Sequence, residues 1–182
     1  MLIMKESSLD EMLSIYEQYA VHDFPASELK QKSHIAKMFS EGLYKGFSFF
    51  HGEFLVAYSW FYTSNSWLFD YFSVLPAYRS RGYGSEILAL LKKTLAGITL
   101  LGEVEDPDFA SGFDDMKIRN RRIHFYERNG MYISDIRTKV LDDHYKIISN
   151  NFLSDDKIRE QIYQLYQDIF GSAFFRANIV IE

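Results

Sequence analysis

The sequence predicts an α/β domain in which strands and helices alternate around a mixed sheet. Its 182 residues suit one domain with a substantial core. Segments with strand character alternate with segments whose apolar residues recur at helical spacing. No internal repeat, linker or low-complexity segment interrupts this order. We therefore expect a core over residues 1–150 and an extra C-terminal helix in an extension over residues 151–182, packed on the same domain or on a second subunit.

The first half of the chain begins with a short strand over residues 2–5, followed by a helix. Ser7 and Ser8 are alternative caps of this helix, because each has an acidic residue three positions later. Ser27 caps a second expected helix, which ends near Gly42. The next expected elements are a hairpin over residues 46–62 that turns at His51-Gly52, a strand over residues 67–74 and a helix that Gly97 ends.

The second half continues the alternation of strands and helices. A strand over residues 98–105 leads into an acidic loop from Asp106 to Asp115 and then a helix over residues 118–129. Strands are expected over residues 131–141 and 145–148. The tail then predicts a helix capped by Ser154 and ended by Gly171, with Ile158, Ile162, Leu165 and Ile169 on one face, and a last short strand over residues 178–181.

Composition excludes several kinds of protein. The chain has no cysteine, which rules out disulfides, thiolate metal sites and cysteine nucleophiles, and its five histidines show no metal-ligand spacing, so no metal is expected. A formal net charge of −5 argues against a nucleic-acid-binding surface. The first residues lack the pattern of a secretory leader, and no apolar run is long enough to span a membrane. A cytoplasmic protein without a membrane or nucleic-acid partner is therefore expected.

A turn between a strand and a helix, over residues 74–85, organises the chain. Gly82 and Gly84 stand at the expected helix start, and Arg79 and Arg81 bring positive charge to the turn. The start of a helix presents unpaired backbone N–H groups and the positive end of a dipole, both of which favour an anion such as phosphate. The pattern predicts an anion-binding turn, with an ordinary surface turn as the alternative.

Two nucleotide-binding loops do not match this turn. The dinucleotide fingerprint needs a third glycine where Ile87 stands, and no Gly-Lys-Ser/Thr follows, as a nucleoside-triphosphate loop would require. The order Val-x-Pro-x-x-Arg-x-x-Gly-x-Gly does occur, however. It is filled by Val74, Pro76, Arg79, Gly82 and Gly84.

This order resembles the pyrophosphate-binding loop of the GCN5-related N-acetyltransferase (GNAT) family. The resemblance implies a mixed, mostly antiparallel central sheet flanked by helices, with residues 1–150 as the acetyltransferase core. It also implies acetyl-CoA as co-substrate. The expected coenzyme-binding residues are Phe72 and Val74, through their backbones, then Arg79, and then Arg81, Gly82, Tyr83, Gly84 and Ser85 as the phosphate cradle.

Residues 121–131 resemble the last core helix of the same family. The match places Tyr126 where many members have a tyrosine that protonates the departing thiolate, and the alternative is a tyrosine that only packs. Members often have an asparagine seven residues earlier that contacts the pantetheine arm. Asn120 lies six residues before Tyr126, so either the alignment is displaced by one residue or that contact is absent here.

The segment Leu101-Gly102-Glu103-Val104-Glu105 resembles a family strand whose glutamate serves as general base. Glu103 is the better positional match and Glu105 the alternative. Strand alternation puts both on one face, so spacing does not separate them. An exposed strand end is the other interpretation.

The resemblance implies an N-acetyltransferase in which an amine attacks acetyl-CoA directly. The acceptor is expected to be a small molecule, with a peptide amine as the alternative, and the aspartates of the loop after residue 105 are hypothesised to attract a cationic amine. One competing interpretation is a non-catalytic acyl-CoA-binding or regulatory module. Another is an interaction protein that forms a homodimer through the tail.

Overall fold

The structure is a computed structural model that describes residues 1–26 and 28–182. The predicted cap Ser27 therefore lies outside the described residues. Contacts divide the chain into two compact units, one formed by Met1–Thr63 with Phe69–Ala96 and the other by Ser64–Leu68 with Gly97–Glu182. Strand β4 (Trp67–Val74) begins in the second unit and continues in the first.

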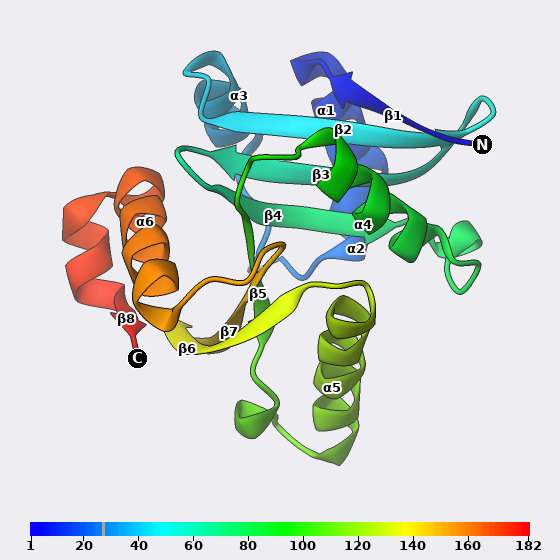
Figure 1. The fold of residues 1–182 in the computed structure, drawn as a ribbon. Helices are drawn as coiled ribbons and strands as arrows, with labels where there is room; N and C mark the ends of the chain where they lie inside the picture. Colours follow the sequence, from blue (N-terminus) through cyan, green and yellow to red (C-terminus); the bar gives the residue numbers. More distant parts are fainter. Residues whose placement is uncertain (27) are drawn as a thin grey trace. The chain divides into compact units, whose positions relative to one another are not determined.

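Within the described residues, hydrogen bonds join eight strands in the order β1-β2-β3-β4-β5-β7-β6-β8. Strands β4 and β5 run parallel, whereas the pairs β1-β2, β2-β3, β5-β7, β6-β7 and β6-β8 run antiparallel. The predicted fold class, a mixed and mostly antiparallel sheet with helices and an extra C-terminal helix, is confirmed (Figure 1).

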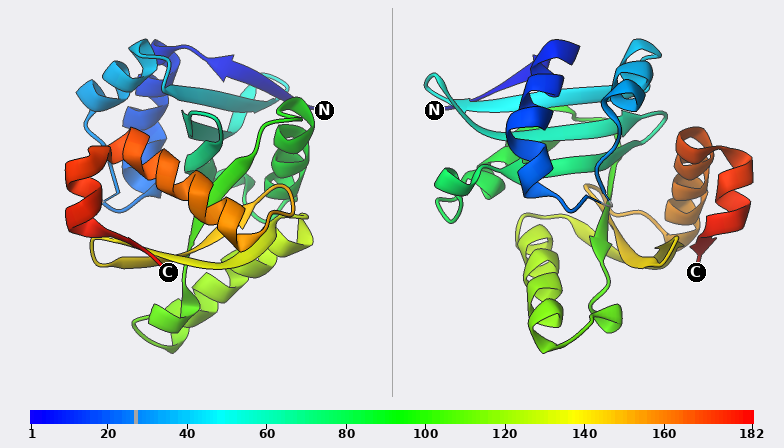
Figure 2. Two further views of the ribbon diagram at one scale, coloured as in Figure 1. Left: turned by 60° about the vertical axis from the view of Figure 1, so that its left-hand side comes forward. Right: turned by 180° about the vertical axis from the view of Figure 1, so that it is seen from behind.

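The first unit holds strands β1 (Leu2–Ser7), β2 (Tyr44–His51) and β3 (Phe54–Thr63), with the later part of β4. Helix α4 (Tyr83–Thr94) covers one face of these strands. Helix α1 (Leu9–Ile15) lies on the other face, as the view from behind shows (Figure 2), and it is followed by α2 (Val21–Asp23) and α3 (Lys32–Ser40). A π-helical turn, Tyr16–Ala20, separates α1 from α2.

The two alternative caps of the first helix are resolved. Ser8 is the cap: its hydroxyl accepts from the N–H of Glu11, and the Glu11 carboxylate accepts from the N–H of Ser8 at 2.7 Å. Ser7 instead ends β1 and is buried. The second helix begins at Lys32.

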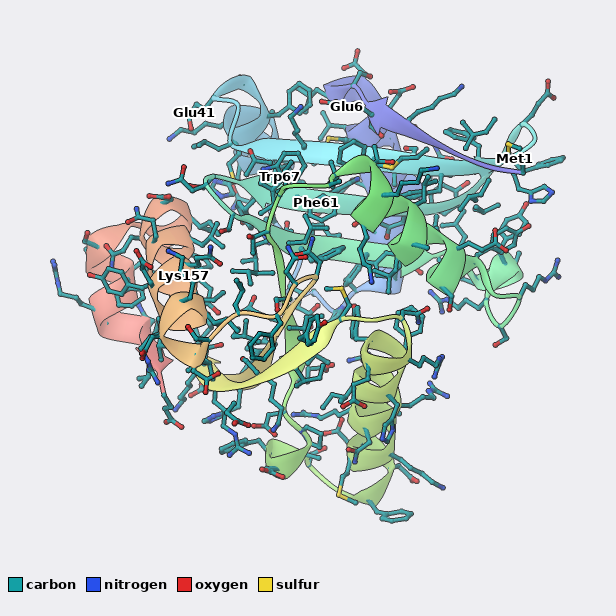
Figure 3. All side chains as sticks on the ribbon, in the orientation of Figure 1. Met1, Glu6, Glu41, Phe61, Trp67 and Lys157 are labelled. Carbon is teal, nitrogen blue, oxygen red and sulfur yellow. The ribbon has the colours of Figure 1, made fainter. Side chains whose placement is uncertain are left out.

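Aromatic rings fill the core of the first unit. Trp60 lies between Tyr58 and Tyr71, with ring centres 5.6 and 5.3 Å away, and all three rings are nearly or fully buried. Phe61, labelled in Figure 3, is fully buried on the same strand. The high aromatic content therefore serves packing here.

The second unit holds the start of β4, β5 (Leu100–Glu105), β6 (Tyr132–Val140), β7 (Asp143–Ser149) and β8 (Ile179–Ile181). Its helices are α5 (Phe113–Arg128) and α6 (Asp155–Asn178). Helix α5 starts earlier than predicted. Asp114 and Asp115 lie in its first turn, where negative charge stabilises the helix dipole, so the acidic loop is shorter than expected.

Helix α6 follows the prediction with one difference. Ser154 caps it by accepting from the N–H of Lys157, which is labelled in Figure 3, and Ile158, Ile162 and Leu165 are buried. Gly171, at φ 77° and ψ 156°, breaks the helix as predicted, but helical residues resume beyond it and continue to Asn178. Over the described ranges, none of the helices combines the length and apolar character needed to cross a bilayer.

Candidate functional site

The predicted anion-binding turn lies in the first unit, between β4 and α4. A single 3-10 turn, Pro76–Tyr78, follows β4, and α4 begins after Gly82, whose φ of 87° is left-handed. Within the described part of the chain, no side chain caps this helix start. The first N–H groups of a helix lack partners inside it, so the turn offers backbone donors to an anion. The Ser85 N–H is an exception, because it already bonds the Gly82 carbonyl at 3.0 Å.

Arg79 is held by the protein. Its Nε donates to the Val74 carbonyl and its guanidinium to Oδ1 of Asp23, each at 2.8 Å. The side chain of Asp23 is only 5% exposed, and it also accepts from the hydroxyls of Tyr58 and Ser73, each at 2.9 Å. Arg79 therefore ties the loop to the end of β4 and to α2, and sequence reasoning missed Asp23, which carries no local signal.

The remaining predicted residues of this turn lie at or near the surface. Arg81 is exposed, and its guanidinium carbon lies 6.0 Å from the centre of the Tyr78 ring. The Tyr83 hydroxyl lies 3.0 Å from Nδ1 of His51. Arg81 is thus placed to add charge beside the helix start. Phe72 and Val74 are half-buried on β4.

The two candidate bases lie on β5 in the second unit and have different partners. Glu103 accepts a hydrogen bond from the Tyr166 hydroxyl of α6. Glu105 forms an ion pair with Arg122 of α5. A cationic partner stabilises the ionised carboxylate more than a neutral phenol does, which makes the carboxylate a weaker base. The two carboxylates, which strand alternation places on one face, thus differ in the side chains that they contact.

Tyr126 lies half-buried on α5, in the same unit. Burial raises the pKa of Tyr126 to about 12, and the charge of Arg122 acts in the opposite direction. The phenol is therefore protonated at neutral pH. Asn120 lies earlier on α5, and its side-chain amide donates to the Met116 carbonyl at 3.0 Å.

Most aspartates of the segment after β5 are already paired. Asp106 is fully buried, with Oδ2 3.0 Å from Nε of Arg137, and Asp108 pairs with the same guanidinium. Asp115 pairs with Arg119 at 3.0 Å, and this hydrogen bond lowers the pKa of Asp115. Because Asp106 and Asp108 share one guanidinium, the charge of these carboxylates is not fully balanced by the two arginines, and the hypothesis that the segment attracts a cationic amine stays a prediction.

The predicted site residues thus fall into two sets, each within one unit. The first unit holds Phe72, Val74 and the turn, and the second holds Glu103, Glu105, Asn120 and Tyr126. Among residues 1–26 and 28–182, histidine, aspartate and glutamate do not gather in groups of three or more that could hold a metal ion.

Comparison with solved structures identifies the fold. A protein from Bacteroides thetaiotaomicron assigned to the GNAT family of acetyltransferases shares 20% identity, with a TM-score of 0.79 over 93% of this chain and 99% of its own. A Salmonella typhimurium protein assigned as an acetyltransferase, with its cofactor acetyl-CoA, gives 13% identity and a TM-score of 0.57 over 85% and 96%. An aminoglycoside 6'-N-acetyltransferase complexed with coenzyme A gives 14% and 0.56 over 84% and 99%.

At these identities the likeness shows a shared fold, and the GNAT resemblance of the sequence is confirmed at that level. Neither a scan of the sequence against family models nor a search of curated proteins found a match.

Proposed function

We propose that this chain is an N-acetyltransferase that moves an acetyl group from acetyl-CoA to an amine of a small molecule. The observation that carries the proposal is the uncapped, glycine-led start of α4 directly after β4, on a fold shared with acetyltransferases. A diphosphate suits this turn because backbone donors and the exposed Arg81 offer it hydrogen bonds and charge. Two proteins of this fold are named with coenzyme A or acetyl-CoA.

In this proposal the first unit binds the co-substrate. The N–H groups at residues 81–84 and the Arg81 guanidinium hold the phosphates, and the backbone of β4 at Phe72 and Val74 lies along the pantetheine. Arg79 keeps the turn in place through Val74 and Asp23. The bound co-substrate supplies an activated acetyl thioester.

The second unit supplies the proton transfers. An alkylammonium has a pKa near ~10, so its proton must be removed before nitrogen attacks, and Glu103 accepts it directly or through water. Tyr126 stays protonated and donates to the departing thiolate. Because a thiol has a pKa of about 8.5, complete proton transfer from this phenol is uphill. The Tyr126 hydrogen bond therefore stabilises the thiolate as the C–S bond breaks, and the released thiolate takes its proton from water.

Structural neighbours named for small amines, among them spermidine N-acetyltransferase chimeras, support a small-molecule acceptor, whereas a ribosomal-protein-S18-alanine N-acetyltransferase supports the alternative of a peptide amine. The aminoglycoside enzyme acts, by its name, on an amine of a small molecule. The alternative of a non-catalytic acyl-CoA-binding module uses the same turn but needs neither Glu103 nor Tyr126. The division of the chain at residue 150 and a homodimer through the tail stay predictions.

A panel of amines with acetyl-CoA, read by release of free thiol, tests the proposal. With an accepted amine, Glu103→Gln should lower kcat/KM about 100-fold or more, whereas Glu105→Gln should cost less than about tenfold. The reverse order would assign the base to Glu105. Tyr126→Phe should lower kcat with little change in coenzyme affinity, and Tyr132→Phe, at a half-exposed tyrosine of β6, is the matched control.

Calorimetry with coenzyme A separates the two functions. Binding without turnover across the whole panel would favour the module. Absence of binding would refute both.

A further inference from the structure

Helix α6 carries a tyrosine that is directed at the candidate base. The Tyr166 hydroxyl donates to Oε1 of Glu103 and lies 3.1 Å from the hydroxyl of Thr138 on β6. Because a hydroxyl both donates and accepts, Thr138 can donate to the Tyr166 oxygen while Tyr166 donates to the carboxylate. Three elements of the second unit thus meet in one short chain of hydrogen bonds.

This contact is enclosed. Tyr166 is fully buried and Thr138 is 1% exposed, whereas Glu103 is half-buried. The Tyr166 ring packs against Phe170 and Phe175 of the same helix, with ring centres 5.9 and 6.5 Å away. The Tyr166 phenol is therefore held in place by packing, whereas Glu103 is partly exposed to solvent.

We infer that Tyr166 is a positioning residue that holds the Glu103 carboxylate ionised and oriented for its role as base. The inference rests on the proposed function, in which Glu103 accepts the proton of the amine. It gives the C-terminal extension a part in the reaction, because α6 supplies the donor.

The direction of the effect follows from the hydrogen bond. A donor to a carboxylate favours its charged form, and removing that donor makes the carboxylate easier to protonate. Burial, and then the Glu103 carboxylate, raise the pKa of Tyr166 well above its ordinary value, so the phenol remains a donor through the neutral range. Two further ionisable groups bear on this contact: Tyr145 of β7, which acts on Tyr166, and Glu105 of β5, which pairs with Arg122.

The test compares Tyr166→Phe with Tyr163→Phe, which removes the same hydroxyl from a half-exposed position of α6. Carbon-13 NMR of the Glu103 carboxyl, assigned with Glu103→Gln, should show its titration displaced upward by about one pH unit or more in Tyr166→Phe. Tyr163→Phe should titrate like the unaltered protein. An unchanged titration in Tyr166→Phe would overturn the inference.

The pH dependence of kcat/KM provides a second, independent test of the inference. With an accepted amine, the acid limb of the kcat/KM profile should move upward in Tyr166→Phe by the same amount. A lower plateau without movement of the limb would mean that Tyr166 only anchors α6, which would overturn the inference while leaving the proposed function intact. If no amine of the panel is acetylated, the proposed function itself fails, and the carbon-13 titration of Glu103 still tests its contact with Tyr166.

A measurement on the unaltered chain covers the case in which Tyr166→Phe does not fold. The Tyr166 ring carbon that bears the hydroxyl should shift in carbon-13 NMR as Glu103 is protonated. A resonance that does not shift as Glu103 titrates would refute the hydrogen bond between Tyr166 and Glu103.

Discussion

Lys30 and Asp70 form a largely buried ion pair whose removal should destabilise the first unit. The Lys30 ammonium lies 2.6 Å from Oδ1 of Asp70, and the two side chains are 21% and 9% exposed. It also lies 5.4 and 5.0 Å from the ring centres of Tyr62 and Tyr71. Tyr44 donates to the other carboxylate oxygen. Burial alone would lower the pKa of Lys30, but Asp70 and Tyr62 outweigh it, and the pKa is raised.

The two single substitutions should lower the free energy of unfolding by different amounts. Lys30→Met leaves the more buried charge, Asp70, with a phenol as its remaining donor, and should lower the free energy of unfolding by about 3–5 kcal/mol. Asp70→Asn leaves an ammonium that is more exposed and retains two aromatic faces, so about 2 kcal/mol is expected. The double variant buries no charge and should be no less stable than Lys30→Met.

Urea unfolding measures these differences. The chain has two tryptophans, and Trp60 belongs to the first unit, so a Trp67→Phe background makes fluorescence report on that unit. The exposed pair of Lys45 and Glu6, 2.8 Å apart, is the matched control, and Lys45→Met should cost less than about 1 kcal/mol. The reasoning fails if Lys30→Met costs no more than this control, or if Asp70→Asn is the costlier change.

Three further outcomes are expected. Gly82→Ala should raise the dissociation constant of coenzyme A. Gly97→Ala is the control, because Gly97 has a similar φ of 90° and an added Cβ meets no atom within 4 Å at either glycine; it should lower stability by the same ~1 kcal/mol without affecting binding. Equal effects on binding would contradict the assignment of the turn. Asp23→Asn should weaken coenzyme binding by roughly tenfold, by calorimetry, because Arg79 loses its charged partner, and unchanged affinity would exclude that role. The first unit should lose stability as the pH rises above about 10. Burial keeps the pKa values of Tyr44, Tyr58, Tyr62 and Tyr71 above the unfolded value, and the ion pair does so for Lys30. Absorbance showing that all 13 tyrosines ionise near pH 10 without loss of circular dichroism would argue against this.

Features set by neighbouring residues could be predicted from the sequence. The hairpin turn, the cap at Ser154 and the glycine break at residue 171 each depend on a few adjacent positions, and each is present. The hairpin turn lies one residue later than predicted, at Gly52 and Glu53, because His51 still pairs with Phe54. The sequence left Ser7 and Ser8 as equal caps because both have an acid three residues later. The structure separates them because β1 pairs with β2 through Ser7, which places Ser8 at the helix start.

Partners far apart in the chain could not be predicted in this way. Asp23 and Arg79 are separated by 56 residues, and Glu103 and Tyr166 by 63. In neither pair does the local sequence around one residue predict its partner. The residue pattern predicted an anion-binding turn, and the family resemblance implied Glu103 or Glu105 as the base. In the structure, Arg79 pairs with Asp23 and Glu105 pairs with Arg122, whereas Glu103 accepts a hydrogen bond from the Tyr166 hydroxyl.

The position of Glu103 also explains why the tail belongs in any account of the chemistry. The partner of the candidate base comes from α6, which follows residue 150, so residues outside the predicted core set the environment of a residue inside it. Deleting residues 152–182 would therefore remove the Tyr166 hydroxyl and bare the apolar face of β6 at the same time, and it could not separate a role in the reaction from a role in stability. The single-atom change Tyr166→Phe separates them, because it keeps the ring packing and removes only the donor.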